Sequence, residues 1–134
     1  MRNWWILLLM LMAPMLASAD ETEAAVAAGV HWLRKVDSAE HQQAYADASN
    51  LMRSAVNFET WQKAIVEARA PLGAVSKREL VYRSLELSVP GLPGGEYAKL
   101  RFRTDFIGRA GVTEHVTMMR DADGSWRTIG YFIQ

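Results

Sequence analysis

The chain has 134 residues, with 15 lysines and arginines against 15 aspartates and glutamates, and it contains no cysteine. This length suits a single domain with one modest hydrophobic core. Balanced charge argues against nucleic acid or an anionic membrane as an electrostatic partner, and without cysteine the fold must be stabilised by packing and not by disulfides.

The first nineteen residues predict a secretory signal peptide. A short positive start that includes Arg2 precedes an apolar run over residues 4–16, and small residues at 17–19 come just before the acidic Asp20. This order predicts cleavage after Ala19, leaving residues 20–134 as one domain that meets a membrane only transiently, through the signal peptide. The less favoured alternative is a membrane anchor, because the run falls short of the ~20 apolar residues that span a bilayer.

Residues 21–37 are predicted to form a helix with one apolar side. Gly29 on that side would let another element approach closely, at about 1 kcal/mol of helix propensity. His31 lies nearly opposite and is expected to be solvated. The residues that share the apolar side are Val26, Gly29, Val30, Leu33 and Val36.

A second helix is predicted over residues 39–50, capped by Ser38, with residues 53–56 as a short irregular link. His41 is expected to be partly buried, and Tyr45 is expected at the edge of the core with its hydroxyl at water. The expected inner face is formed by His41, Ala44, Tyr45 and Ala48.

A third helix is predicted to begin at Phe58, capped by Asn57, and to end near residues 69–73. Pro71 disfavours the helical conformation of the residue before it, and Gly73 can take the left-handed conformation that ends a helix. We expect this helix to organise the fold, with Trp61 and Phe58 docked on Phe102 of the sheet. Its apolar stripe is Phe58, Trp61, Ile65, Ala68 and Leu72.

After Gly73 the apolar period changes from 3.6 to 2, which predicts four antiparallel strands. They are expected over residues 79–89, 96–106, 112–120 and 125–133, with a surface turn at 90–95 and a type I turn at 121–124 that places Gly124 for a bulge. In the second strand, Ala98, Leu100, Phe102, Thr104 and Phe106 face one way, and Tyr97, Lys99, Arg101, Arg103 and Asp105 face the other.

The turn between the second and third strands predicts a register, with Phe106 opposite Val112, Thr104 opposite Glu114, Phe102 opposite Val116 and Leu100 opposite Met118. The last strand is apolar on both faces. Trp126, Gly130 and Phe132 are expected in the core and Ile129, Tyr131 and Ile133 outside, unless a slip of one residue exchanges the two sets. Either arrangement leaves an apolar triple on the outer face, which favours self-association through the sheet or partial coverage by a loop.

The predicted fold class is therefore α+β. About three N-terminal helices, over roughly residues 21–72, should pack on one face of a four-stranded antiparallel sheet, over roughly residues 78–133.

Motifs for common chemistry are missing from the sequence. The three histidines are far apart in the chain and show no metal-ligand spacing, and no Gly-x-Ser-x-Gly elbow, cysteine nucleophile or phosphate-binding loop occurs. We expect neither a metal nor a cofactor.

The candidate site is a polar pair at the edge of apolar surfaces. Arg69 and Glu114 should meet between helix and sheet, either as an ion pair that fixes helix registry or, less favoured, as a binding site to which Tyr131 belongs. Weaker candidates for catalysis are Glu114, Asp105 and Tyr45. The outer face of the sheet carries a basic strip that is either solvated or suited to an acidic partner or an anionic ligand, formed by Lys99, Arg101, Arg103 and His115.

Several segments resemble the exported bacterial family catalogued as domain of unknown function 4019. They are RAPLG at 69–73, PGLPGGEY at 90–97, WR at 126–127 and GY at 130–131, with WL at 32–33, VD at 36–37 and AY at 44–45 earlier in the chain. Departures from the family pattern are His41, where an aromatic residue is expected, and Gly95, where aspartate is common. The resemblance implies a cystatin-like α+β fold, similar to the nuclear-transport-factor-2-like superfamily, in the bacterial cell envelope. It implies no activity, because the family has none assigned.

Two functions remain open. The favoured one is a non-enzymatic module in the periplasm of a Gram-negative bacterium, which binds a small apolar ligand, an envelope protein or a second copy of itself as a homodimer. The alternative is a small isomerase- or dehydratase-like enzyme with an acid/base site between helices and sheet.

Overall fold

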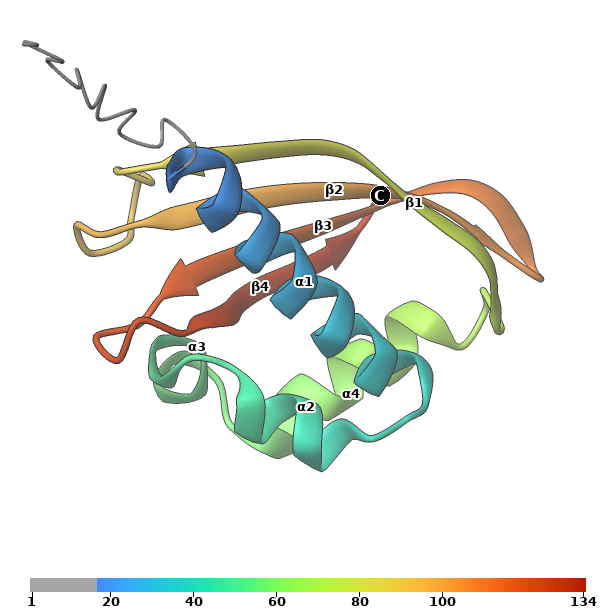
Figure 1. Cartoon of the computed structure of the whole chain (residues 1–134). Helices are drawn as coiled ribbons and strands as arrows, with labels where there is room; N and C mark the ends of the chain where they lie inside the picture. The colour runs from blue at the N-terminus through green and yellow to red at the C-terminus, as the bar shows by residue number, and fades with distance from the viewer. Residues whose placement is uncertain (1–16) are drawn as a thin grey trace, which may run out of the picture.

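The computed structural model describes residues 17–134; most of the predicted signal peptide, residues 1–16, lies outside this range. Within it, four helices precede a four-stranded antiparallel sheet, so the predicted α+β class is confirmed (Figure 1). The elements are α1 (Ala17–Asp37), α2 (His41–Asp47), α3 (Asn50–Ala55), α4 (Phe58–Arg69), β1 (Val75–Glu86), β2 (Tyr97–Phe106), β3 (Arg109–Arg120) and β4 (Trp126–Ile133). None of the helices in residues 17–134 is sufficiently long and apolar to cross a membrane.

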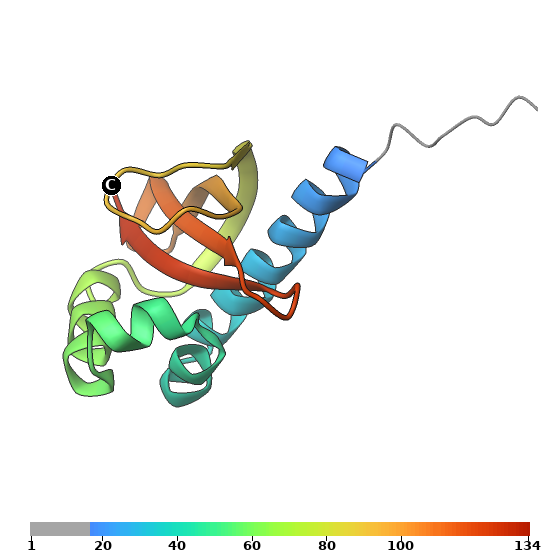
Figure 2. The same cartoon turned by 90° about the vertical axis from the view of Figure 1, so that its left-hand side faces the viewer.

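The helix that organises the fold is α1 and not the predicted α4. α1 runs diagonally across the sheet and contacts all four strands, whereas α2, α3 and α4 lie together beyond its β4 edge (Figure 1 and Figure 2). Trp61 of α4 is buried in the same core as Phe102, but its ring contacts are with Trp32 of α1 and Tyr45 of α2, at centroid distances of 6.2 and 5.6 Å. Phe58 is only partly buried. The prediction that Trp61 and Phe58 both dock on Phe102 was therefore wrong in its detail.

α1 approaches the sheet closely at Gly29. A Cβ atom at this position would lie 2.8 Å from Cδ1 of Leu100 and 3.6 Å from the sulfur of Met118. The predicted close approach is therefore confirmed. Trp32, which the predicted apolar side omitted, is also buried, and its indole nitrogen donates to the carbonyl of Ala44 at 2.9 Å.

The predicted second helix is two helices. α2 begins at His41 after Ala39 takes a positive φ of 57°, and its N-cap, Glu40, makes no side-chain capping bond, so Ser38 is not the cap. The helix breaks at Ala48, and the hydroxyl of Ser49 caps α3 by accepting from Leu51 N. At the break, the backbone is hydrogen-bonded to the sheet instead of within a helix, because Ser49 N donates to Thr128 O of β4 at 2.9 Å.

The predicted ends of the third helix are confirmed. The side chain of Asn57 accepts from Thr60 N at 2.8 Å, and Gly73 has a φ of 74°. Gly124 likewise has the positive φ expected of the bulged turn before β4.

β1 begins and ends earlier than predicted, and the β2–β3 register differs by two residues. Phe102 lies opposite Glu114 and Leu100 opposite Val116, because the chain reverses over a tight turn that pairs Phe106 with Arg109. A shift of two keeps every side chain on its predicted face. Tyr97 is the exception in burial: it belongs to the outer face, yet it is fully buried, and its hydroxyl donates to Pro93 O of the β1–β2 connection.

β4 changes face part-way along its length. Thr117 pairs with Gly130 but Met118 pairs with Thr128, so Ile129 is an extra residue that forms a β-bulge. Thr128 is buried before the bulge, whereas Phe132 after it is 57% exposed. Trp126 packs against the core as in the first predicted register, whereas Tyr131 and Ile133 pack on core clusters as in the exchanged one. Neither register therefore holds along the whole strand, and the outer apolar triple does not form.

Candidate functional site

The predicted pair of Arg69 and Glu114 exists, as part of a larger charge cluster. Arg69 Nη1 lies 3.4 Å from Glu114 Oε2 and 3.2 Å from the hydroxyl of Tyr131, so all three predicted binding residues meet. Each of the six residues in this cluster comes from a different element: Asp37 (α1), Arg69 (α4), Arg78 (β1), Thr104 (β2), Glu114 (β3) and Tyr131 (β4).

Glu114 is the centre of the charge cluster, and its side chain is fully buried. Oε1 accepts from Arg78 Nε at 2.7 Å and from the hydroxyl of Thr104, and Oε2 accepts from the hydroxyl of Tyr131. These donors and the two guanidiniums offset the desolvation of the carboxylate.

Asp37 closes the charge cluster toward solvent. Its Oδ1 accepts from Arg69 Nη2 at 2.6 Å, and its Oδ2 accepts from Arg78 Nη1 at 2.7 Å. Two carboxylates therefore face two guanidiniums, and the cluster is electrically balanced.

The pKa shifts reflect this arrangement. Burial favours protonation of Asp37, but the hydrogen bonds and positive charges of Arg78 and Arg69 outweigh burial and hold its pKa below the usual 3.8. Burial raises the pKa of Tyr131, and the neighbouring Glu114 raises that pKa further. Tyr131 is therefore a neutral donor at physiological pH.

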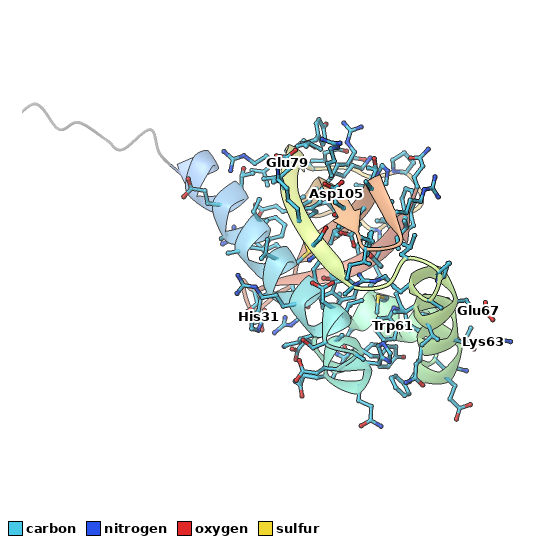
Figure 3. The ribbon with its side chains drawn as sticks, turned by 90° about the vertical axis from the view of Figure 1, so that its right-hand side faces the viewer. His31, Trp61, Lys63, Glu67, Glu79 and Asp105 are labelled. Atoms are coloured by element: carbon cyan, nitrogen blue, oxygen red, sulfur yellow. The ribbon has the colours of Figure 1, made fainter. Side chains whose placement is uncertain are left out.

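The other predicted candidates for catalysis do not join the charge cluster. Asp105 Oδ1 accepts from Gly111 N at 2.7 Å on the outer face of the sheet. In Figure 3, Asp105 lies by the strands, whereas Trp61 lies among the helices. The hydroxyl of Tyr45 does not end at water, because it donates to Val56 O at 2.6 Å. Among residues 17–134, no three histidine or acidic side chains are grouped to hold a metal ion.

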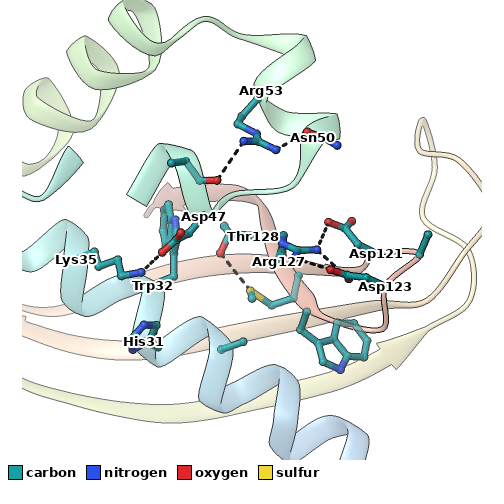
Figure 4. A pocket seen from close by; sticks show the side chains of 15 residues that line it. His31, Trp32, Lys35, Asp47, Asn50, Arg53, Asp121, Asp123, Arg127 and Thr128 are labelled. Atoms are coloured by element: carbon teal, nitrogen blue, oxygen red, sulfur yellow. Dashed lines mark hydrogen bonds and ion pairs between the residues drawn. The ribbon is translucent and has the colours of Figure 1, made fainter. Parts of the chain in front are cut away.

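A separate hollow of about 740 Å³ lies between α1, the α2–α3 segment and the β3–β4 turn (Figure 4). Three segments line the hollow with a small side chain: α1 with Ala28, α2 with Ala46 and the β3–β4 turn with Ala122. Trp126 and Met118 supply apolar walls from the sheet.

Charged groups surround this hollow, and most of them are paired. Lys35 pairs with Asp47, and Arg127 pairs with Asp121 and Asp123 at 2.8 and 2.7 Å.

Arg53 differs from the other cations at the hollow. Its Nη1 donates to the carbonyl of Ala46 at 3.1 Å and its Nη2 donates to the amide oxygen of Asn50, so its hydrogen-bond partners are neutral. Among residues 17–134, no carboxylate lies within ion-pair distance of Arg53.

Sequence reasoning missed both the hollow and half of the charge cluster. Asp37 could be placed only once α1 was known to cross the sheet. Arg78 was missed because the predicted first strand began at residue 79, whereas β1 begins at Val75. The hollow depends on the break at Ser49, which a hydrogen bond to a distant strand produces. Isolated small residues such as Ala28 do not by themselves indicate a hollow.

Comparisons with known proteins identify a family without an assigned activity. A search of curated proteins and a search of solved structures each returned no match. Residues 28–131 match the family described as "Protein of unknown function (DUF4019)". The matched range includes the C-terminal part of α1, helices α2–α4, strands β1–β3 and most of β4. The chain therefore belongs to the DUF4019 family.

Proposed function

We propose that this protein is a small-molecule-binding module of the bacterial periplasm, and that its ligand occupies the hollow beside the β3–β4 turn. Export is supported by the predicted signal peptide. The arrangement of helices on one face of an antiparallel sheet is compatible with the cystatin-like and nuclear-transport-factor-2-like folds implied by the sequence resemblance.

The observation that carries the proposal is the hollow of about 740 Å³, which has the size of a small-molecule site. Trp126 and Met118 offer apolar surface, and Arg53 offers a positive charge that no carboxylate of the described chain neutralises. These groups suit a small amphipathic molecule with an acidic group at one end.

The acid/base alternative has less support from the geometry. Glu114 is fully buried and accepts from arginine, threonine and tyrosine donors, so it has no free lone pair directed at a substrate. Asp105 lies on the other face of the sheet, and Tyr45 donates to the backbone. None of these three residues lines the hollow.

Filling the hollow tests the proposal. Ala28 lines it, so Ala28→Trp should occupy the space and weaken binding of the amphipathic probe 1-anilinonaphthalene-8-sulfonate by about tenfold or more. Probe fluorescence measured against protein concentration gives the Kd.

Ala27→Trp is the matched control, because Ala27 is exposed on the same helix and does not line the hollow. This variant should keep the wild-type Kd, and circular dichroism should show that both variants are folded. Equal binding by Ala28→Trp and Ala27→Trp, or no saturable binding by the wild type, would contradict the proposal.

A further inference from the structure

A row of four side chains crosses the outer face of the sheet, opposite the face on which α1 packs. Tyr82 of β1, Arg101 of β2, His115 of β3 and Phe132 of β4 are successive Cα partners, so each strand supplies one member. We call these four residues the outer row.

The outer row consists of two stacked pairs. The Arg101 guanidinium carbon lies 4.0 Å from the centroid of the Tyr82 ring, and the rings of His115 and Phe132 are stacked at 4.2 Å with an interplanar angle of 5°. A guanidinium held over the face of an aromatic ring keeps its N–H edge free to donate. Tyr82 and Phe132 remain 39% and 57% exposed.

A second hollow, of about 360 Å³, lies beside the outer row and is lined by all four of its members. The next row of the same face explains the space. Its Cα partners are Ser84, Lys99, Thr117 and Gly130, so three of the four positions carry a small side chain or none.

The charge at this second hollow is positive and partly uncompensated. Lys99 pairs with Glu86 at 3.5 Å. Arg101 has no carboxylate within ion-pair distance in residues 17–134, and its only described partner is the face of Tyr82. A guanidinium held in this way matches the planar geometry of a carboxylate.

We infer that the outer face of the sheet holds a binding site for a small aromatic acid. Arg101 receives the carboxylate, and the ring of the acid packs in the second hollow against the exposed edge of Phe132 and over Thr117. This site is independent of the hollow beside the β3–β4 turn, which lies between helices and sheet.

Titration of the ¹⁵N-labelled protein with benzoate tests the inference. Amide resonances of Arg101, His115 and Thr117 should shift together and saturate, and inorganic phosphate, which carries charge without a ring, should bind more weakly. Arg101→Gln should weaken benzoate binding by about tenfold or more, because a charged hydrogen-bond donor is lost. Phe132→Ala should also weaken binding.

Arg103→Gln is the matched control. Arg103 lies on the same strand and the same face, one row away, opposite Glu79, and this substitution removes the same charge without touching the outer row. It should leave the Kd for benzoate unchanged. Equal weakening by Arg101→Gln and Arg103→Gln would overturn the inference, because benzoate would then respond only to overall charge.

The Ala28→Trp variant separates this site from the one proposed above. Outer-face binding should persist in that variant. Benzoate binding that is lost in Ala28→Trp but kept in Arg101→Gln would overturn the inference while leaving the proposed function intact. Shifts of the outer-row resonances on dilution without benzoate would also overturn it, because a second copy of the chain would then cover this face.

Discussion

At the scale of single residues, the most constrained group is Glu114. A buried carboxylate is unfavourable unless donors and positive charge surround it, and four residues supply them here: Arg69, Arg78, Thr104 and Tyr131. Arg69 and Arg78 each contact both carboxylates of the charge cluster, so removing either guanidinium leaves negative charge in a poorly solvated place.

Arg69→Met is expected to destabilise the protein by ~3–5 kcal/mol, the usual effect of removing one partner from a buried pair. The midpoint of urea unfolding at neutral pH measures this change. Lys63→Met is the matched control on the same helix, because Lys63 is exposed and its pair with Glu67, at 4.0 Å, contributes little. An Arg69→Met midpoint equal to that of wild type would rule out a structural role for the pair.

At the scale of elements, sequence patterns correctly predicted the features that depend on residues close together in the chain. The alternation in β2 gave the right inner face, and Asn57 and Gly73 correctly mark the ends of α4, because caps and pleats depend on local geometry. The break between α2 and α3 depends instead on Ser49 bonding to Thr128, far away in the chain. The bulge at Ile129 depends on how β4 pairs with β3. An apolar run in the sequence does not by itself determine that pairing.

The contact between α1 and the sheet can be tested at Gly29. Gly29→Val should destabilise the fold by ~1–3 kcal/mol, because its Cβ would overlap Cδ1 of Leu100 in a close-packed layer. Thermal unfolding of Gly29→Val, Leu100→Ala and the double variant gives the coupling between the two positions.

The double variant should be more stable than the sum of the two single changes predicts, since the shortened Leu100 side chain makes room for valine. Ala27→Val, on the exposed side of the same helix, should show no such coupling with Leu100→Ala. Strict additivity at Gly29 would mean that α1 does not press on Leu100.

At the scale of the whole molecule, the charge cluster joins two helices to all four strands. The fold class was predictable because helical and strand periods occupy separate halves of the chain. Of the charge cluster, Arg69, Glu114 and Tyr131 were predicted as a site, and Thr104 was predicted beside Glu114 without a role. Asp37 required the crossing of α1, which no local pattern specifies, and Arg78 lay outside the predicted first strand. The predicted homodimer stays a prediction, but the bulge at Ile129 removes the apolar triple on which it was based.

Acid unfolding should report the charge cluster. The folded-state pKa of Asp37 is below its unfolded value of about 3.8, so its contribution is present above that pH and is lost as the pH falls through the folded pKa. Asp37→Asn should lower stability at pH 7 and reduce the dependence of stability on pH below about 4. Urea midpoints measured from pH 7 down to about pH 2.5 check both effects. If the stability of Asp37→Asn depended on pH below about 4 as that of the wild type does, Asp37 would be excluded as a contributor.

The crossing of α1 over every strand also affects how the chain can reach its final state. Neighbouring strands in the sheet are neighbours in sequence, so hairpins can form one after another from local contacts. The apolar side of α1 is fully covered only when β4, the last strand of the sheet in chain order, docks. Until β4 has been synthesised, that helix keeps apolar surface exposed to water, and the native core cannot close.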